Sequence, residues 1–184
     1  MSDRMARIIQ NLRSFARQES VPQKRVDVVR VVASAIELTQ TYLDDAGVTL
    51  AYDPPETPVW VHGGEVRLGQ VFVNLIKNAC DAMKGLEAEK TLTIRIAVDP
   101  RNPDAHVCIS VSDNGGGIEP ENLGHLFDPF FTTKSIGDGL GLGLSIVSSI
   151  VRDLNGQISA ENRVEGGACF TVILPRYLCP QDSE

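Results

Sequence analysis

Apolar residues near the start of the chain recur at helical spacing. Met5, Ile8, Leu12 and Phe15 are 3, 4 and 3 positions apart, the spacing of a helix that pairs with other helices. One helix cannot bury such a stripe alone. We therefore expect it either to pack on the following domain or to form one arm of a helical bundle, and we expect it to end at Pro22.

The rest of the chain alternates between strand and helix patterns. Strands are expected at residues 26–29, 48–52, 59–61, 92–98, 107–111, 156–161 and 169–174, and helices from 32 to near 47 and at 65–84 and 144–154. The strands at 92–98 and 107–111 alternate apolar and polar residues, as half-buried antiparallel strands do. This order predicts an α/β fold, a two-layer sandwich of helices on a mixed, largely antiparallel sheet.

The helix at 65–84 carries two distinct faces. Its predicted buried face consists of Leu68, Phe72, Leu75, Ala79 and Met83. Gln70, Asn74, Asn78 and Asp81 follow one another at spacings of 4, 4 and 3, so they share another face. Asparagine is unfavourable inside a helix because it prefers caps and turns. A solvated surface is the simple explanation, but the glycine-rich turn that follows favours a binding site.

Two glycine clusters flank a long loop. Asp113 ends an apolar strand and runs into Gly115–Gly117, and about 20 residues later a second cluster, Gly139–Gly143, opens an apolar helix. Glycines let a backbone approach a ligand closely, and the N–H groups at a helix start suit a phosphate. We interpret the two glycine clusters as a nucleotide site. Asp113 is expected at the nucleobase end, the second cluster at the phosphates, and the loop between the clusters as a lid.

The same pattern suggests a metal ion beside the phosphates. Asn78 offers a neutral carbonyl oxygen, which suits Mg²⁺ held jointly by protein, phosphates and water. Lys134 lies in the lid and is expected to pair with the terminal phosphate, unless it is an ordinary surface lysine.

Composition narrows the class of protein. The 184 residues suffice for one compact domain plus a short appendage. A net charge of −7 argues against nucleic acid as a partner and requires an anionic ligand to be held locally. The four cysteines lack metal-binding spacing and are expected to be reduced thiols. We see neither a signal peptide nor an apolar run of the length that a membrane helix needs.

Four motifs together resemble the ATP-binding domain of sensor histidine kinases, within the superfamily that includes Hsp90, gyrase and MutL. Residues 70–82 resemble its N box, 113–118 its G1 box, 126–134 its F box and 139–145 its G2 box. Their order and spacing match over nearly all of residues 25–175. The resemblance implies the Bergerat (GHKL) ATP-binding fold, with ATP and Mg²⁺ as ligands.

The resemblance also implies residue roles. Asn78 would bind Mg²⁺ with Asn74 beside it, and Asp113 would accept a hydrogen bond from the adenine amino group, with Gly115 and Gly117 shaping that wall. The other ATP contacts that it implies are Asp81, Ile118, Phe131, Thr132, Thr133, Lys134, Gly139, Leu140, Gly141, Leu142, Gly143 and Leu144. Phe127, Phe130 and Phe131 would anchor the lid, although these aromatic residues could equally belong to the core.

One position separates the branches of this superfamily. Hydrolytic members carry a glutamate four residues before the metal-binding asparagine, as the base for the attacking water. This chain has Asn74 there, and an amide cannot accept the water's proton as a carboxylate does. We therefore expect slow hydrolysis and phosphoryl transfer to another acceptor, with Asn74, Asn78 and Lys134 as the catalytic set.

The N-terminal segment fits the same family. Residues 7–17 resemble the second helix of the dimerisation hairpin, so we expect part of that hairpin at 1–20 and the catalytic domain at 21–180. The acceptor histidine of the family lies on the first hairpin helix, and His62, His106 and His125 do not occur in such a context. The chain therefore resembles a C-terminal fragment that binds ATP without phosphorylating itself.

The strand at 166–170 is similar to that of kinases of the C4-dicarboxylate transport type, with Ala168 where many relatives have threonine. The resemblance implies a response regulator partner, with the NtrC type as the expectation, and a second kinase subunit bound through the hairpin. It implies a cytoplasmic domain of a sensor anchored in the inner membrane. The alternatives are a gyrase- or Hsp90-like ATPase clamp, a serine kinase of the anti-sigma type and a non-catalytic binding module.

Overall fold

The computed structural model describes residues 24–98, 105–133 and 141–177. The predicted N-terminal helix, the proposed domain boundary at residue 20 and three predicted site residues, Lys134, Gly139 and Leu140, lie outside these ranges.

The described residues form three α-helices, seven strands and a short 3-10 turn. The helices are α2 (Val28–Ala46), α3 (Glu65–Ala82) and α4 (Gly143–Asp153), and the 3-10 turn η1 spans Pro120–Asn122. The strands are β1 (Lys24–Asp27), β2 (Val48–Tyr52), β3 (Trp60–Gly63), β4 (Lys90–Val98), β5 (His106–Asp113), β6 (Gln157–Asn162) and β7 (Ala168–Pro175). Every predicted strand and helix between residues 26 and 174 is present, with ends shifted by a few residues.

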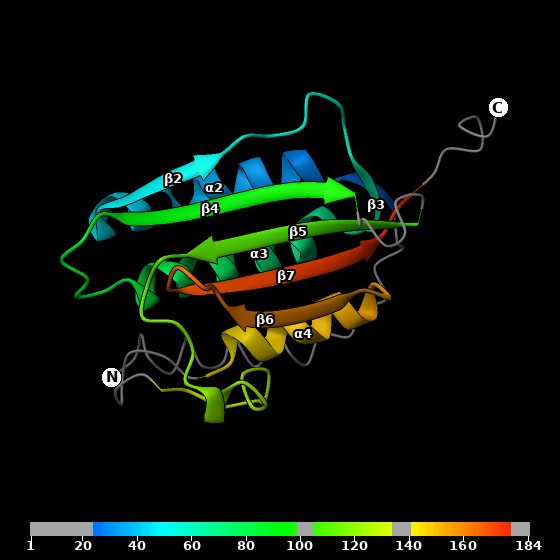
Figure 1. Ribbon diagram of the computed structural model, residues 1–184. Helices are drawn as coiled ribbons and strands as arrows, with labels where there is room; N and C mark the ends of the chain where they lie inside the picture. Colours follow the sequence, from blue (N-terminus) through cyan, green and yellow to red (C-terminus); the bar gives the residue numbers. More distant parts are fainter. Residues whose placement is uncertain (1–23, 99–104, 134–140, 178–184) are drawn as a thin grey trace, which may run out of the picture.

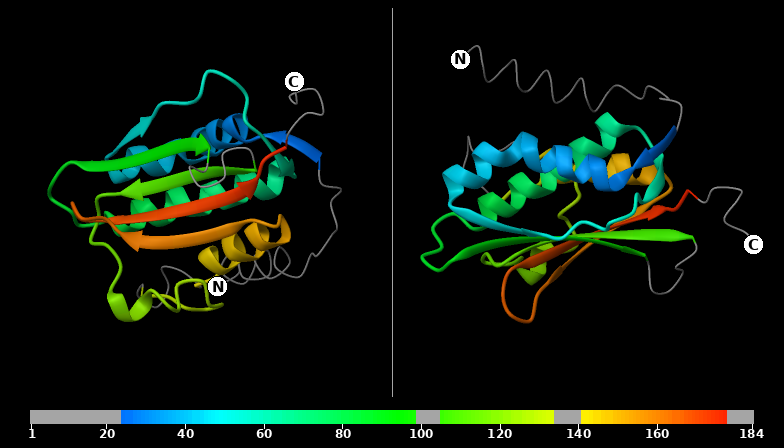
Figure 2. Two further views of the ribbon diagram at one scale, coloured as in Figure 1. Left: turned by 45° about the vertical axis from the view of Figure 1, so that its right-hand side comes forward. Right: turned by 90° about the horizontal axis from the view of Figure 1, so that it is seen from above.

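Five strands form the main sheet, in the order β2-β4-β5-β7-β6 (Figure 1). Strand β2 pairs with β4 in parallel, and the other neighbours are antiparallel. The three helices cover one face of this sheet, as the view from above shows (Figure 2). The predicted two-layer α/β sandwich with a mixed, largely antiparallel sheet is confirmed.

A second, two-stranded sheet pairs β1 with β3. The strand predicted at 26–29 lies two residues earlier in the chain, at Lys24–Asp27. The helix predicted to start at Val32 starts about one turn earlier, at Val28, because Asp27 is its N-cap. The Asp27 carboxylate accepts a hydrogen bond from the Val29 N–H at 3.1 Å, so β1 ends at Asp27 and α2 begins at Val28.

The core lies between the helices and the main sheet. The predicted buried face of the third helical segment is confirmed, since Leu68, Phe72, Leu75, Ala79 and Met83 are each at most 3% exposed. This burial fixes the rotation of α3 about its axis, because the apolar stripe must face the core. The polar stripe is thereby directed away from the core, toward the lid segment and the start of α4.

Candidate functional site

A cavity of about 490 Å³ lies between α3, the end of β5, the lid segment and the start of α4. The predicted site residues that line it are Asn74, Asn78, Asp81, Asp113, Gly117, Ile118, Phe131, Thr132, Thr133, Gly141, Leu142, Gly143 and Leu144. Gly115 is not among them. It packs under the cavity against α3, where a Cβ on Gly115 would lie 2.5 Å from the Ala82 carbonyl oxygen.

The polar stripe of α3 forms one wall. Gln70, Asn74, Asn78 and Asp81 all line the cavity, as their shared helix face predicts. The Asn74 amide donates a hydrogen bond to the Gly143 carbonyl at 3.4 Å, so this part of the stripe adjoins the first residue of α4. Asp81 is held by Lys84, whose amine lies 2.6 Å from its carboxylate.

Asp113 forms the opposite end of the cavity and is 1% exposed. Its Oδ1 accepts hydrogen bonds from the N–H groups of Gly115 at 2.9 Å and of Ala168 at 3.3 Å. Both bonds end on Oδ1, so among the described residues Oδ2 keeps its capacity to accept a bond from a ligand. Burial raises the pKa of this carboxyl above its ordinary value, although the two hydrogen bonds and the nearby Arg163 oppose the shift.

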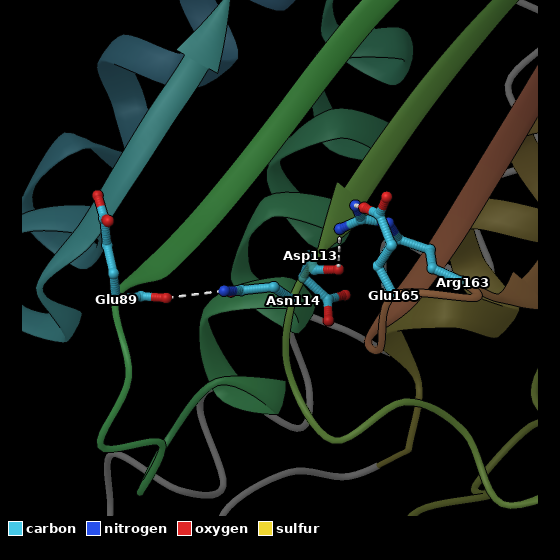
Figure 3. Close-up of polar contacts among 5 residues, drawn as sticks. All are labelled: Glu89, Asp113, Asn114, Arg163 and Glu165. Carbon is cyan, nitrogen blue, oxygen red and sulfur yellow. Dashed lines mark hydrogen bonds and ion pairs between the residues drawn. The ribbon is translucent and has the colours of Figure 1, made fainter.

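The backbone around Asp113 is fixed from two sides (Figure 3). The Arg163 guanidinium donates to the Asp113 carbonyl at 2.9 Å. On the other side, the Asn114 side chain donates to the Glu89 carbonyl at 2.7 Å and accepts from the Thr91 N–H at 2.8 Å. The turn at Asp113 and Asn114 is thus attached to the β6–β7 hairpin and to the start of β4. Its geometry is therefore set before a ligand binds.

The start of α4 faces the cavity without a side-chain cap. Leu142 precedes the helix and its side chain makes no capping bond, so no side-chain cap occupies the first N–H groups of α4, and Gly143 and Leu144 at this helix start line the cavity. Gly141 has φ +65° and contacts the lid, where a Cβ would lie 2.5 Å from the Phe131 carbonyl oxygen. The Phe130 N–H donates to the Gly141 carbonyl at 3.0 Å, which joins the lid to the helix start.

The structure adds lining residues that the sequence did not identify as ligand contacts. They are Gln70, Lys77, Ala82, Gly116, Glu119, Asn122, Leu126, Ile146, Ala168 and Phe170. Lys77 had a detectable signal, because it falls three residues after Asn74 and four before Asp81, on the same helix face. Ala168 had a signal in the family resemblance, because many relatives have threonine there and that hydroxyl would contact adenine. Phe170 had none, since its nearness to the end of β5 depends on the pairing of β5 with β7.

Comparisons with known proteins agree with this geometry. Residues 63–178 match the family described as histidine kinase-, DNA gyrase B-, and HSP90-like ATPase. The C4-dicarboxylate transport sensor protein DctB of Pseudomonas aeruginosa is 36% identical over 168 residues, which cover 91% of this chain and 27% of that protein. The sensor histidine kinase TrcS of Mycobacterium tuberculosis is 44% identical over 126 residues, which cover 66% of this chain and 24% of TrcS.

Solved structures of histidine kinases are similar in fold to this chain. The nucleotide-free catalytic domain of histidine kinase ThkA has a TM-score of 0.71 at 26% identity, covering 83% of this chain and 97% of that one. Full-length ShkA in complex with AMPPNP has a TM-score of 0.76 at 25% identity, covering 96% of this chain and 37% of that one. The chain spans about a quarter of the length of the two curated relatives named above.

Proposed function

The chain belongs to the family of histidine kinase-, DNA gyrase B- and HSP90-like ATPases, and from this membership we propose that it is the ATP-binding catalytic portion of a two-component sensor histidine kinase. It transfers the γ-phosphoryl group of ATP to a histidine on a dimerisation helix, for relay to an aspartate of a response regulator. The proposal draws on the sensor kinases among its relatives and on the AMPPNP complex of ShkA.

The observation that carries the kinase proposal is the position of Asn74. Its amide lies at the start of α4, within hydrogen-bond reach of Gly143, beside the proposed phosphate site. A carboxylate in this place could remove a proton from water, whereas an amide has essentially no basicity. The site therefore favours holding ATP without hydrolysis, and the γ-phosphoryl group remains available for another acceptor.

The other roles follow from the order of residues around the cavity. Asp113 accepts a hydrogen bond from the adenine amino group, and the N–H groups at the start of α4 bind the phosphates. Asn78 fits Mg²⁺, because it lines the cavity and its side-chain carbonyl oxygen is a single neutral ligand, which suits an ion that is shared with phosphates and water. Bound Mg²⁺ would offset phosphate charge. Lys134, outside the described residues, is proposed to reach the terminal phosphate.

These residues act mainly by position. The lid excludes water. The start of α4 and the polar stripe of α3 hold the triphosphate from two sides for in-line transfer. The described histidines have other partners or places. The His62 ring lies tilted against Tyr177 with ring centroids 4.8 Å apart, His125 pairs with Asp128 at 2.8 Å and His106 begins β5. The acceptor histidine is therefore supplied from the dimerisation hairpin.

The whole protein is proposed to dimerise through that hairpin, with residues 1–20 as part of it and 21–180 as the catalytic domain. Its proposed partner is a response regulator of the NtrC type, and its proposed setting is the cytoplasmic side of a membrane-anchored sensor. Among the described residues, no helix is both long and apolar enough to cross a membrane.

Two linked measurements test the proposal. Calorimetric titration with a non-hydrolysable ATP analogue, with and without Mg²⁺, measures binding. A transfer assay with a separately made hairpin that carries the histidine then measures chemistry. Mg²⁺-dependent binding with transfer and little released phosphate is the expected result. Rapid phosphate release without transfer would favour an ATPase, and binding without either reaction would favour a non-catalytic module.

A further inference from the structure

Lys77 lies on the face of α3 that forms the cavity wall. Gln70, Asn74, Lys77 and Asp81 follow one another at spacings of 4, 3 and 4, which places the lysine inside the polar stripe. All four residues line the cavity. Its neighbour in sequence, Asn78, is the proposed Mg²⁺ ligand.

Lys77 is the cation among the described residues that line the cavity. Among the described lining residues, three carry carboxylates, Asp81, Asp113 and Glu119, and only Lys77 carries a positive charge. Asp81 already pairs with Lys84, and Arg163 lies near Asp113, although neither cation lines the cavity. A nucleoside triphosphate brings further negative charge, and Lys77 is the cation among the described lining residues that can meet it. Attraction between opposite charges in a partly enclosed cavity is stronger than in open water, so we expect Lys77 to contribute to binding alongside the proposed Mg²⁺ and Lys134.

The Lys77 amine has no carboxylate partner among the described residues. Its Nζ instead lies 4.5 Å from the centre of the Tyr42 ring, on the neighbouring helix α2. Tyr42 is 49% exposed, and a cation over a ring at an exposed site is held only weakly compared with a cation paired to phosphate. The long side chain can therefore leave the ring for an anionic ligand at small cost.

The contacts of Asn74 and Lys77 show where Lys77 lies relative to the start of α4. Asn74 contacts Gly143 of α4, whereas Lys77 contacts Tyr42 of α2, so the stripe lies between them. We infer that Lys77 binds the phosphates of the nucleotide, opposite the N–H groups at the start of α4. This inference rests on the proposed function, because it assigns a further binding residue to the same site.

The test compares Lys77→Met, Lys77→Arg and the control Lys90→Met by calorimetric titration with an ATP analogue, ADP and adenosine. Lys90 is a matched control because its amine donates to the Ala46 carbonyl at 2.9 Å and does not line the cavity. Lys77→Met should weaken binding of the ATP analogue roughly tenfold, as loss of a charged hydrogen bond does. Adenosine binding should stay unchanged, and Lys77→Arg should restore most of the lost affinity.

Each other outcome overturns the inference in a recognisable way. Equal losses for the ATP analogue and adenosine would mean that Lys77 only supports the fold. Tyr42→Leu adds a second check, because a purely structural Lys77–Tyr42 contact predicts the same loss from either variant. If Lys77→Met binds ATP as Lys90→Met does, Lys77 has no phosphate role while the proposed function stands. If the unaltered chain binds no ATP, the proposed function fails as well.

Discussion

The side chain of Asn162 holds both backbone polar groups of Ile118. Its amide donates to the Ile118 carbonyl and its Oδ1 accepts from the Ile118 N–H, each at 2.7 Å. Gly117 approaches the same amide so closely that a Cβ there would lie 2.9 Å from Asn162 Oδ1, and its φ is +75°. The β6–β7 hairpin therefore fixes the loop beside Asp113, at the proposed nucleobase end of the cavity, where the predicted lid begins.

Replacing Asn162 with alanine should loosen that loop. We expect Asn162→Ala to weaken binding of adenosine and of an ATP analogue by the same factor, up to about thirtyfold, because the two lost hydrogen bonds are together worth ~2 kcal/mol. Calorimetric titration measures both ligands. Val164→Ala is the matched control, since Val164 lies in the same hairpin and its side chain is fully exposed. A loss confined to the ATP analogue would contradict the base-end assignment.

Asp113→Asn should separate base recognition from folding. The asparagine carbonyl can still accept from Gly115 and Ala168, as Oδ1 does, but its NH₂ replaces the second acceptor with a donor. We expect at least a tenfold loss of adenosine affinity, because a donor would then face the adenine amino group. Circular dichroism should show an unchanged fold. Adenosine binding at the original affinity would remove the assigned role.

The raised pKa of Asp113 also predicts a dependence of stability on pH. A carboxyl whose pKa is higher in the folded than in the unfolded state contributes stability below the unfolded pKa, and this contribution is lost as pH rises through the folded pKa. The free energy of unfolding should therefore fall, relative to that of Asp113→Asn, as pH rises from about 4 through the raised pKa. Urea unfolding of both proteins across this range measures the difference. Parallel pH profiles would show that burial does not shift this group.

The sequence predicted most of the fold because its periodic patterns coincide with burial. The apolar stripe of α3 from Leu68 to Met83 marks one buried face, and so does the alternation of apolar and polar residues in β4 and β5. These segments were placed to within a few residues. The β1–β3 pairing was not predicted. It joins segments separated by the whole of α2, and the strand register between Lys24 and Gly63 has no local signature.

The site was predictable where one element carries several of its residues. The polar stripe of α3 and the two glycine clusters are local patterns, and among the described residues the structure brings Gly116, Gly117, Gly141 and Gly143 to the same cavity as the stripe. The Asn162–Ile118 clamp could not be predicted, because 44 residues separate its partners and only the strand order brings them together. Gly115 resembled a ligand contact, yet its small size is required by the nearby Ala82 carbonyl.

Gly141 and Gly143 should respond differently to an added methyl group. Gly141→Ala places a Cβ against the Phe130 and Phe131 backbone at 2.5 Å, in a backbone conformation that disfavours side chains. We expect a loss of about 1–3 kcal/mol in the free energy of unfolding, together with weaker nucleotide binding. Gly143→Ala is the control, because Gly143 is helical and a Cβ there meets nothing within 4 Å. Equal stabilities in urea unfolding would show that the lid does not depend on the Gly141 conformation.

Asn78 should be responsible for the dependence of nucleotide binding on Mg²⁺. Asn78→Ala removes the only proposed protein ligand, so affinity for the ATP analogue should become nearly independent of Mg²⁺. Asn78→Asp keeps an oxygen ligand at the same place and should retain that dependence, although the added charge lowers affinity for the triphosphate. Titrations of each variant with and without Mg²⁺ give the ratio of dissociation constants, which is the decisive quantity. Adenosine affinity should stay constant in both variants, because the proposed contact of the nucleobase is Asp113. An unchanged Mg²⁺ ratio in Asn78→Ala would place the metal on other residues.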